Sequence, residues 1–306
     1  MADGRFAPSP SGPLHLGNLR TALLAWLYAR QAGSRFLVRV EDLDPVSSRP
    51  EHVAGHLADL AALGLAWDGP VVVQSERRAL HDAALRRLVD AGTTYPCYCS
   101  RREVREAAVA AHGDEGAATY PGTCRDLGPA ARARREAEGR RPALRLRAEG
   151  VRVAVHDRFA GRVERDVDDV VLRRADGVPA YNLAVVVDDV EQGVEEVVRG
   201  VDLLDVTPTQ AHLADLLGLP RPAWTHVALV VGPDGARLAK RHGAVSLAEL
   251  GARGVAPGRV RAWMGAGLGL CEPDEPVAVE LLLERFDPSV APPTWTFDPS
   301  RADPGR

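Results

Sequence analysis

The chain has 306 residues, of which 45% are hydrophobic and 26% charged, a profile typical of a folded globular protein. Its 38 basic and 42 acidic side chains give a formal net charge of −4, which excludes binding to nucleic acid by bulk attraction alone. No run approaches the ~20 apolar residues that cross a bilayer, and the N-terminus lacks the layout of a signal peptide. Four cysteines are too few for a disulfide scaffold, so we expect a cytoplasmic protein of two or more domains.

The basic side chains comprise 37 arginines and a single lysine, Lys240. A genome that favours arginine codons accounts for the arginines, because arginine replaces lysine wherever a generic cation suffices. A lysine ammonium and a planar guanidinium are not interchangeable at a catalytic site. We therefore regard Lys240 as a candidate functional residue, against the alternative that one lysine survived by chance.

The start of the chain has the pattern of a nucleotide-binding α/β unit. Residues 5–7 lead into a loop of Gly, Pro and Ser at 8–17, and apolar residues at helical spacing predict a helix from Asn18 to about Gly33. Alternation at 36–40 predicts a strand that ends in an acidic turn. Strand, glycine loop, helix and strand together are typical of such folds.

Beyond residue 93 this pattern is interrupted and then resumes. Helices are predicted at about 49–63, 76–91, 207–217 and over most of 246–284, and strands at 151–156, 168–173, 180–188, 194–199 and 225–231, with a weakly ordered proline-rich tail after 287. We predict an α/β core formed by 1–93 and 181–235, an insertion at 94–180, and a loop and helical C-terminal region at 236–306.

The loop at 8–18 has the composition of an anion-binding site. Ser9, Ser11, Gly12 and Gly17 precede a predicted helix whose first N–H groups and positive dipole end attract negative charge. His15 lies in this loop, where an imidazole can donate a hydrogen bond to a phosphate oxygen. The glycine spacing matches neither a Walker loop nor GxGxxG, and a turn with a packed histidine fits it equally well.

A second segment with glycines at both ends, at 235–244, contains Lys240. The glycines allow this segment to move. A lysine that reaches a phosphate-binding helix end can stabilise charge during phosphoryl or nucleotidyl transfer.

These two segments resemble the signatures of class I aminoacyl-tRNA synthetases. PSGPLHLGN at 10–18 resembles the HIGH motif, and RLAKR at 237–241 resembles the KMSKS loop. Further segments resemble the glutamyl branch of this family, and the resemblance spans about 5–250. They are RFAPSPSG at 5–12, RVEDLDP at 39–45, YCSRRE at 98–103, AYNLAVVVDD at 180–189 and VVRGVDLL at 197–204.

The resemblance implies an α/β fold: a Rossmann-type parallel sheet with an inserted zinc-containing subdomain and a short helical C-terminal region. It also implies an ATP-dependent ligase that forms a carbon–oxygen bond, in which ATP with Mg²⁺ activates L-glutamate to glutamyl-adenylate. A full glutamyl enzyme carries an anticodon-binding domain for which 306 residues leave no room, and EDLD at 41–44 replaces the usual EDTD. Both features favour the short paralogues, which activate glutamate without tRNA and place it on the queuosine base of tRNA(Asp).

Three alternatives stay open. The chain could be a truncated enzyme that charges tRNA(Glu), a non-catalytic paralogue that binds tRNA or amino acid, or a nucleotidyltransferase with a HIGH-type loop. We expect a monomer with no membrane partner.

The resemblance further assigns roles to residues. The ATP site it implies consists of His15, Gly17, Asn18 and Lys240, with His15 and Lys240 as the catalytic pair. The glutamate site it implies consists of Arg5, Phe6, Ala7, Pro8, Ser9, Glu41, Tyr181 and Arg199. Two arginines and one acid complement the two carboxylates and one ammonium of free glutamate. Arg237 and Ala239 stand where the family loop has lysine and serine, so we expect slower activation rather than none.

Three of the four cysteines, Cys97, Cys99 and Cys124, lie within 28 residues of a turn-rich segment. Clustered thiolates in a reducing compartment indicate one structural zinc ion, against the alternative of free cysteines. Spacing alone nominates His112 as the fourth ligand, whereas the family resemblance implies Tyr120. Cys271 stands alone and is expected to be a small buried apolar residue.

The stretch 125–147 carries eight arginines against three acidic residues, a local charge of +5. Such a run is most often a solvated helix face. Beside an insertion that contacts tRNA in the related enzymes, it is also a candidate for phosphate contacts.

Overall fold

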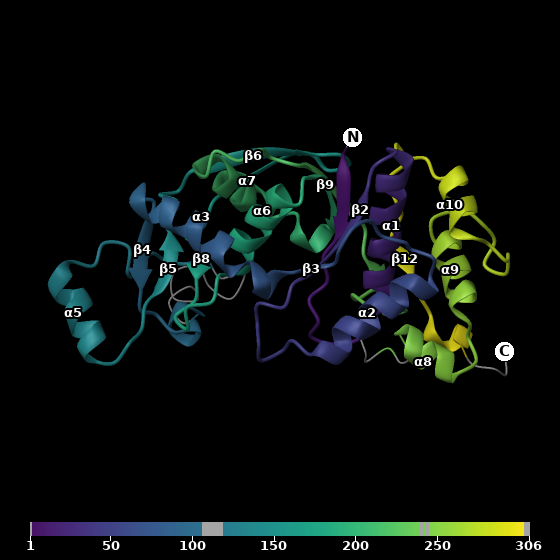
Figure 1. Cartoon of the computed structure of the whole chain (residues 1–306), viewed down its shortest axis with the longest axis horizontal. Helices are drawn as coiled ribbons and strands as arrows, with labels where there is room; N and C mark the ends of the chain where they lie inside the picture. The colour runs from purple at the N-terminus through teal and green to yellow at the C-terminus, as the bar shows by residue number, and fades with distance from the viewer. Residues whose placement is uncertain (1, 106–118, 239–241, 243–244, 303–306) are drawn as a thin grey trace.

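A computed structural model describes residues 2–105, 119–238, 242 and 245–302. Its centre is a seven-stranded sheet in the order β3-β2-β1-β9-β10-β6-β7, in which every neighbouring pair is parallel except β6 and β7 (Figure 1). The strands are β1 (Asp3–Phe6), β2 (Phe36–Val40), β3 (Val72–Val73), β6 (Arg152–Asp157), β7 (Gly161–Asp166), β9 (Val194–Gly200) and β10 (Ala223–Val227). The mostly parallel α/β architecture confirms the predicted fold class.

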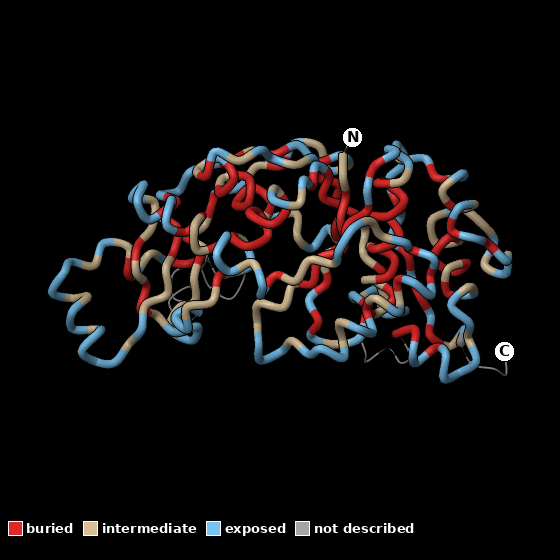
Figure 2. Tube along the Cα trace, viewed as in Figure 1, coloured by how far each residue is buried: buried red, intermediate tan, exposed pale blue. Residues whose placement is uncertain are grey.

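Helices cover both faces of this sheet, which therefore separates two hydrophobic cores. Helix α1 (Leu16–Gln31) lies on one face, and α3 (Arg78–Asp90), α6 (Tyr181–Glu191) and α7 (Thr207–Leu216) pack on the other. Successive residues of β2 point to opposite sides: Phe36 and Val38 enter the first core and Leu37 enters the second. All five residues of β2 are buried, as expected for a parallel strand covered on both faces (Figure 2).

Most predicted elements are confirmed, including α1, α7 and the helices α2 (Pro50–Ala62) and α3. The strand predicted at 180–188 is wrong, because these residues form helix α6. A run of valines favours strands, and side chains from Leu183 to Asp189 are all buried between neighbouring elements. A helix buried on every side shows no polar face, so its 3.6-residue period is invisible in the sequence.

A second, antiparallel sheet lies at one end of the molecule (Figure 1, left). It has the order β4 (Thr94–Cys97), β5 (Ala143–Leu146) and β8 (Val171–Arg173), and the solvent-exposed helix α5 (Pro129–Ala137) extends beyond it. Strands β6 and β7 also fall within residues 94–180, the range predicted as an insertion, yet they pair within the central sheet.

The C-terminal region packs against α1 through α8 (Leu247–Ala252), α9 (Pro257–Ala266) and α10 (Val279–Arg285). The prediction of a weakly ordered tail is wrong. Strand β12 (Trp295–Thr296) pairs with β11 (Val230–Val231), and Phe297, 1% exposed, stacks near Trp263. Aromatic packing therefore orders this segment, although its many prolines leave no helical or strand periodicity in the sequence. Short 3-10 turns complete the described chain: η1 (Gln74–Arg77), η2 (Val201–Leu203) and η4 (Pro299–Ala302).

Among the described residues, no helix combines the length and apolar character needed to cross a membrane.

Candidate active site and cysteine cluster

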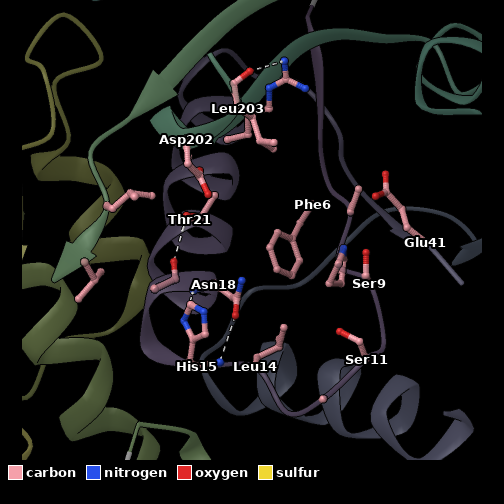
Figure 3. Close-up of a pocket in the computed structure, with 18 of the residues that line it drawn as sticks. Phe6, Ser9, Ser11, Leu14, His15, Asn18, Thr21, Glu41, Asp202 and Leu203 are labelled. Carbon is pink, nitrogen blue, oxygen red and sulfur yellow. Dashed lines mark hydrogen bonds between the residues drawn. The ribbon is translucent and has the colours of Figure 1, made fainter. Parts of the chain in front are cut away.

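A cavity of about 560 Å³ opens where β1 and β9 end and α1 begins (Figure 3). In parallel α/β sheets, ligands bind at the carboxyl ends of two neighbouring strands whose chain connections leave in opposite directions. Here β1 lies between β2 on one side and β9 on the other, so the carboxyl end of β1 is such a point. All eight residues of the predicted glutamate site line this cavity, together with His15, Gly17 and Asn18 of the predicted ATP site. Lys240, Ala239 and His112 lie outside the described residues.

The N-terminus of α1 forms one wall, and His15 is its capping residue. His15 Nδ1 accepts a hydrogen bond from the Asn18 backbone N–H (3.2 Å), while Asn18 Oδ1 accepts one from the His15 N–H (3.2 Å). Since Nδ1 is an acceptor, the ring proton resides on Nε2. Burial lowers the pKa of His15, and the charge of Arg237 lowers it further. The result is a neutral imidazole with one N–H donor at the start of a helix.

Gly17 allows this arrangement of His15. A Cβ atom at residue 17 would lie 2.8 Å from His15 Cε1, closer than side-chain carbons approach one another. The ring therefore folds back over a position that only glycine fills without a shift.

A cluster of buried charges forms the opposite wall. Arg5 Nε pairs with Asp189 Oδ1 (3.2 Å), and Arg39, on β2, pairs with Asp189 Oδ1 (2.7 Å) and with Glu41 Oε1 (3.2 Å). Burial is the largest influence on the pKa of Glu41 and raises it, although Arg39 and Arg5 act against this. Burial also disfavours ionisation of Asp189, but Arg5 and Arg39 outweigh it and lower the pKa. Two guanidinium groups thus face two carboxylates.

Sequence reasoning missed Arg39 and Asp189. A signal was available for Arg39, because it stands in the middle of an apolar strand that is buried on both faces. A charge in such a position requires a partner. Asp189 falls in the segment mistaken for a strand, so its direction could not be inferred.

Arg199, at the end of β9, lies on the same cavity and has neighbours of another kind. It is 5% exposed and donates to Gln210, Thr207 and His226, none of which carries a negative charge. Within the described part of the chain Arg199 forms no ion pair. Because the Arg5 cluster is balanced, Arg199 gives the cavity a locally uncompensated positive charge.

The segment with the changed KMSKS-like motif is anchored beside this cavity. Arg237 Nη1 pairs with Asp202 Oδ2 (2.6 Å), and both residues line the cavity. On the far side of the segment, the Leu16 N–H donates to the carbonyl of Val245 (2.8 Å). The two described ends of the segment, Arg237 and Val245, are therefore tied to the turn that follows β9 and to the first turn of α1.

A second cavity of about 910 Å³ adjoins the first and shares Ser9, Glu41 and Tyr181 with it. It extends towards Cys97 and Cys99 and is flanked by Arg101. Arg174 pairs with Asp44 at 3.5 Å across its rim. This opening connects the Arg5–Arg199 cavity with the antiparallel sheet.

The three clustered cysteines meet in the structure. The Sγ atoms of Cys97, Cys99 and Cys124 lie within 4.8 Å of one another, so they could hold a metal ion. Tyr120 Oη lies 3.3 Å from Cys97 Sγ and 3.6 Å from Cys99 Sγ, which brings the predicted fourth ligand to the same point. Clustered cysteine thiols are donors that fit zinc, and the Tyr120 oxygen lies beside them as a fourth donor atom. Cys271, expected to be buried, is half-buried, and its thiol donates to the Ala262 carbonyl.

Half of the arginines at 125–147 act within the protein. Arg125 pairs with Asp169 (2.7 Å), Arg140 with Glu103 (2.9 Å) and Arg147 with Asp126 (3.2 Å). Arg145 is buried, donates to the Asp169 carbonyl and stacks on the Tyr120 ring at 3.8 Å. Asp126 already counts towards the net +5 of the stretch, so Asp169 and Glu103, which lie outside it, offset two of the five charges.

The fold and this cavity define a class I tRNA synthetase catalytic domain. The family described as "tRNA synthetases class I (E and Q), catalytic domain" matches residues 2–263, and the chain belongs to this family.

Individual relatives narrow the comparison. The glutamyl-Q tRNA(Asp) synthetase of Nocardia farcinica is 61% identical over 94% of this chain and 90% of its own length. The protein of the same name from Symbiobacterium thermophilum is 51% identical, covering 94% and 93%. A glutamate–tRNA ligase from Nitratidesulfovibrio vulgaris is 42% identical, and the match covers 92% of this chain but 60% of the ligase. The crystal structure of a glutamate tRNA ligase from Elizabethkingia meningosepticum, in complex with its amino acid, superposes with a TM-score of 0.83 at 25% identity, covering 98% of this chain and 68% of that one.

Proposed function

We propose that this chain activates L-glutamate with ATP, without tRNA, and transfers the glutamyl group to the queuosine base of tRNA(Asp). The observation that carries the proposal is the charge pattern of the cavity, with an uncompensated Arg199 facing a wall that contains Glu41. The names and full-length coverage of the relatives from Nocardia and Symbiobacterium support the same activity.

Glutamate fits this pattern charge for charge. Arg199 receives one carboxylate, because it has no competing carboxylate among the described residues. Glu41, with Arg39 behind it, is the acceptor for the substrate ammonium. Arg5 forms an ion pair with Asp189. If the second carboxylate of glutamate binds Arg5, the guanidinium group is therefore shared between glutamate and Asp189. Tyr181, which lines both cavities, lies at the entrance.

The ATP phosphates bind at the first turn of α1. The positive end of the helix attracts them, and the Nε2–H of His15 donates a hydrogen bond to them. Mg²⁺ enters with ATP and neutralises phosphate charge. Lys240, in the motif that begins with the anchored Arg237, is proposed to stabilise the charge that develops on the leaving pyrophosphate.

Both reaction steps transfer a group by displacement. A carboxylate oxygen of glutamate attacks the α-phosphorus of ATP; a mixed anhydride forms and pyrophosphate leaves. A hydroxyl of the modified base then attacks the glutamyl carbonyl carbon, loses its proton, and displaces AMP, which leaves an ester. The second cavity, which shares three side chains with the first, is the proposed approach for the base.

The cysteine cluster is proposed to bind one zinc ion through Cys97, Cys99, Cys124 and Tyr120. When bound, the ion supplies a structural crosslink between the end of β4 and the turn at 120–124. The chain itself orients the phenol: Tyr120 Oη accepts the backbone N–H of Cys124 (2.9 Å), and Arg145 covers its ring.

The first experiment is ATP–pyrophosphate exchange with glutamate in the absence of tRNA. Exchange with glutamate, and not with aspartate or glutamine, supports the proposal, whereas no exchange favours a non-catalytic binding protein. The second experiment compares tRNA(Asp) with and without queuosine, each with and without its 3′-terminal adenosine. Glutamylation that requires queuosine and survives loss of the adenosine supports the proposal. Charging of tRNA(Glu) that requires the 3′ adenosine would instead identify a glutamate–tRNA ligase.

A further inference from the structure

A buried acid–imidazole pair lies directly behind Arg199. Asp157 ends strand β6 and His226 lies on the adjacent strand β10; their side chains are almost completely inaccessible to solvent. Neither residue lines the cavity, and the HIGH-type and KMSKS-type motifs do not include them. His226 reaches the cavity through the Arg199 guanidinium, which its Nε2 contacts at 3.0 Å.

Asp157 determines which nitrogen of His226 carries the proton. Its Oδ2 faces both the backbone N–H (2.9 Å) and the Nδ1 (2.8 Å) of His226, and its Oδ1 accepts the N–H groups of Phe159 and Ala160. Burial disfavours ionisation, but these hydrogen bonds outweigh it and lower the pKa of Asp157 to about 2. An ionised carboxylate only accepts, so Nδ1 of His226 must be the donor and Nε2 presents a lone pair.

That lone pair receives Arg199. Arg199 Nε lies 3.0 Å from His226 Nε2, and Nη1 donates to Gln210 Oε1 (2.8 Å). Nη2 donates to Thr207 Oγ1 (2.8 Å) and to the Leu203 carbonyl (3.3 Å). Gln210 is held in turn by Asn182 (3.1 Å). Four neutral acceptors from three elements fix the plane of the guanidinium.

The contrast with Arg5 shows what the imidazole achieves. A carboxylate in direct contact, as Asp189 is with Arg5, orients an arginine but also neutralises it. With an imidazole between them, Asp157 orients Arg199 from a distance and leaves the positive charge for a ligand. Conversely, protonation of His226 would replace the acceptor with a donor and add a like charge beside Arg199.

We propose that Asp157 and His226 are positioning residues that hold Arg199 oriented and uncompensated for the substrate carboxylate. This inference rests on the proposed glutamate activation. It predicts that changes at His226 act on the glutamate site through Arg199 and leave the ATP site, at the start of α1, unaffected.

Three substitutions of His226 separate the contact of the ring with Asp157 from its contact with Arg199. The amide nitrogen of asparagine falls near Nδ1 and reaches Asp157 but not Arg199, whereas the end of glutamine falls near Nε2 and offers Arg199 an acceptor oxygen. In pyrophosphate exchange we expect H226A and H226N to raise KM for glutamate by about tenfold, the effect of losing one buried hydrogen bond to a charged group. We expect H226Q to restore KM to within about threefold of wild type, and KM for ATP to be unchanged throughout.

D157N tests the proton assignment. In D157N the amide N–H group replaces Oδ2 and donates to Nδ1 of His226, so the ring proton moves to Nε2. That proton then faces the Nε–H of Arg199, and the acceptor for Arg199 is lost. We expect D157N to raise KM for glutamate at least as much as H226A. If D157N does not fold, the His226 series alone decides the proposal.

His81 provides a matched control. It is a second buried histidine on a carboxylate, with Nε2 2.9 Å from Asp188 Oδ1, and it lines neither cavity. H81Q is expected to lower Tm as H226A does but to leave KM for glutamate within about twofold of wild type. The proposal is overturned if H226A and H226N keep a wild-type KM for glutamate, if H226Q is no better than H226A, or if H81Q raises KM equally. Failure of the wild-type protein to exchange at all refutes the proposed function instead.

Discussion

The Arg5–Arg199 cavity and the cysteine cluster reach their geometry in different ways. Residues of the cavity come from positions 5 to 237 and meet because parallel strands end at one edge of a sheet. The four residues of the cluster come from positions 97 to 124 and meet at one strand end and one turn. The cavity therefore depends on long-range topology, and its proposed role is catalytic. The cluster depends on local chain geometry, and its proposed role is structural. Substitutions in the cavity should alter catalysis at nearly constant stability, and substitutions in the cluster should do the reverse.

The largest effect on activation is expected for R199A. The substitution removes the uncompensated cation that the proposal assigns to a substrate carboxylate, and losing such a buried pair costs about 3–4 kcal/mol, or roughly 10²–10³ in kcat/KM. R199K retains the charge but not the bonds to His226, Gln210 and Thr207, so we expect it to recover only a minor part. Exchange kinetics at varied glutamate measure both. A wild-type KM in R199A would remove the basis of the glutamate site.

The next largest effect is expected for K240R. A guanidinium does not replace a compact ammonium at a transition state, so we expect exchange to slow by about 10–100-fold with little change in KM for glutamate. The matched control is R237K, which alters a neighbouring cation that is held by Asp202. Activation by K240R at the wild-type rate would show that the single lysine has no catalytic role.

A pH-dependent effect is expected for Glu41. Burial raises its pKa above the usual 4.5, so the carboxylate that binds the substrate ammonium is lost as the pH falls towards that raised value. E41Q has no such charge at any pH. We expect E41Q to raise KM for glutamate by about tenfold near neutral pH, and the ratio of its KM to that of wild type to shrink as the pH falls. Because titration of glutamate itself affects both proteins, the ratio isolates Glu41. A ratio independent of pH would contradict this role.

The smallest effect on activation, and the largest on stability, is expected for C124A. Loss of one thiol should remove zinc and lower Tm by about 5–10 °C, while KM for glutamate stays within about threefold of wild type. Metal analysis and thermal unfolding measure the two changes, and C271A is the control because Cys271 lies outside the cluster. Less than about half an equivalent of zinc in the wild-type protein, purified without chelators, would exclude the site.

The sequence predicted features correctly where a short segment of the chain contains all the residues involved. The capped loop of His15, the strand that ends at Glu41 and the cysteine spacing could all be read from short segments. It failed at α6, where complete burial removes the helical period, and at the tail, where Trp295 and Phe297 find distant aromatic partners. The missed residues Arg39 and Asp189 belong to an ion-pair cluster whose members come from different elements.

The sequence by itself predicted the types of functional group and the class of chemistry: an anion-binding helix start, two arginines and an acid proposed for glutamate, and thiols proposed for a metal. Only the tertiary structure decided how the arginines differ. Arg5 and Arg199 are equivalent in the sequence, yet strand order places Asp189 against one and His226, backed by Asp157, against the other. Each short segment determines which functional groups it contains. Whether an arginine keeps its positive charge available for a substrate depends on its partners, which can lie up to 184 positions away and come into contact only when the sheet packs.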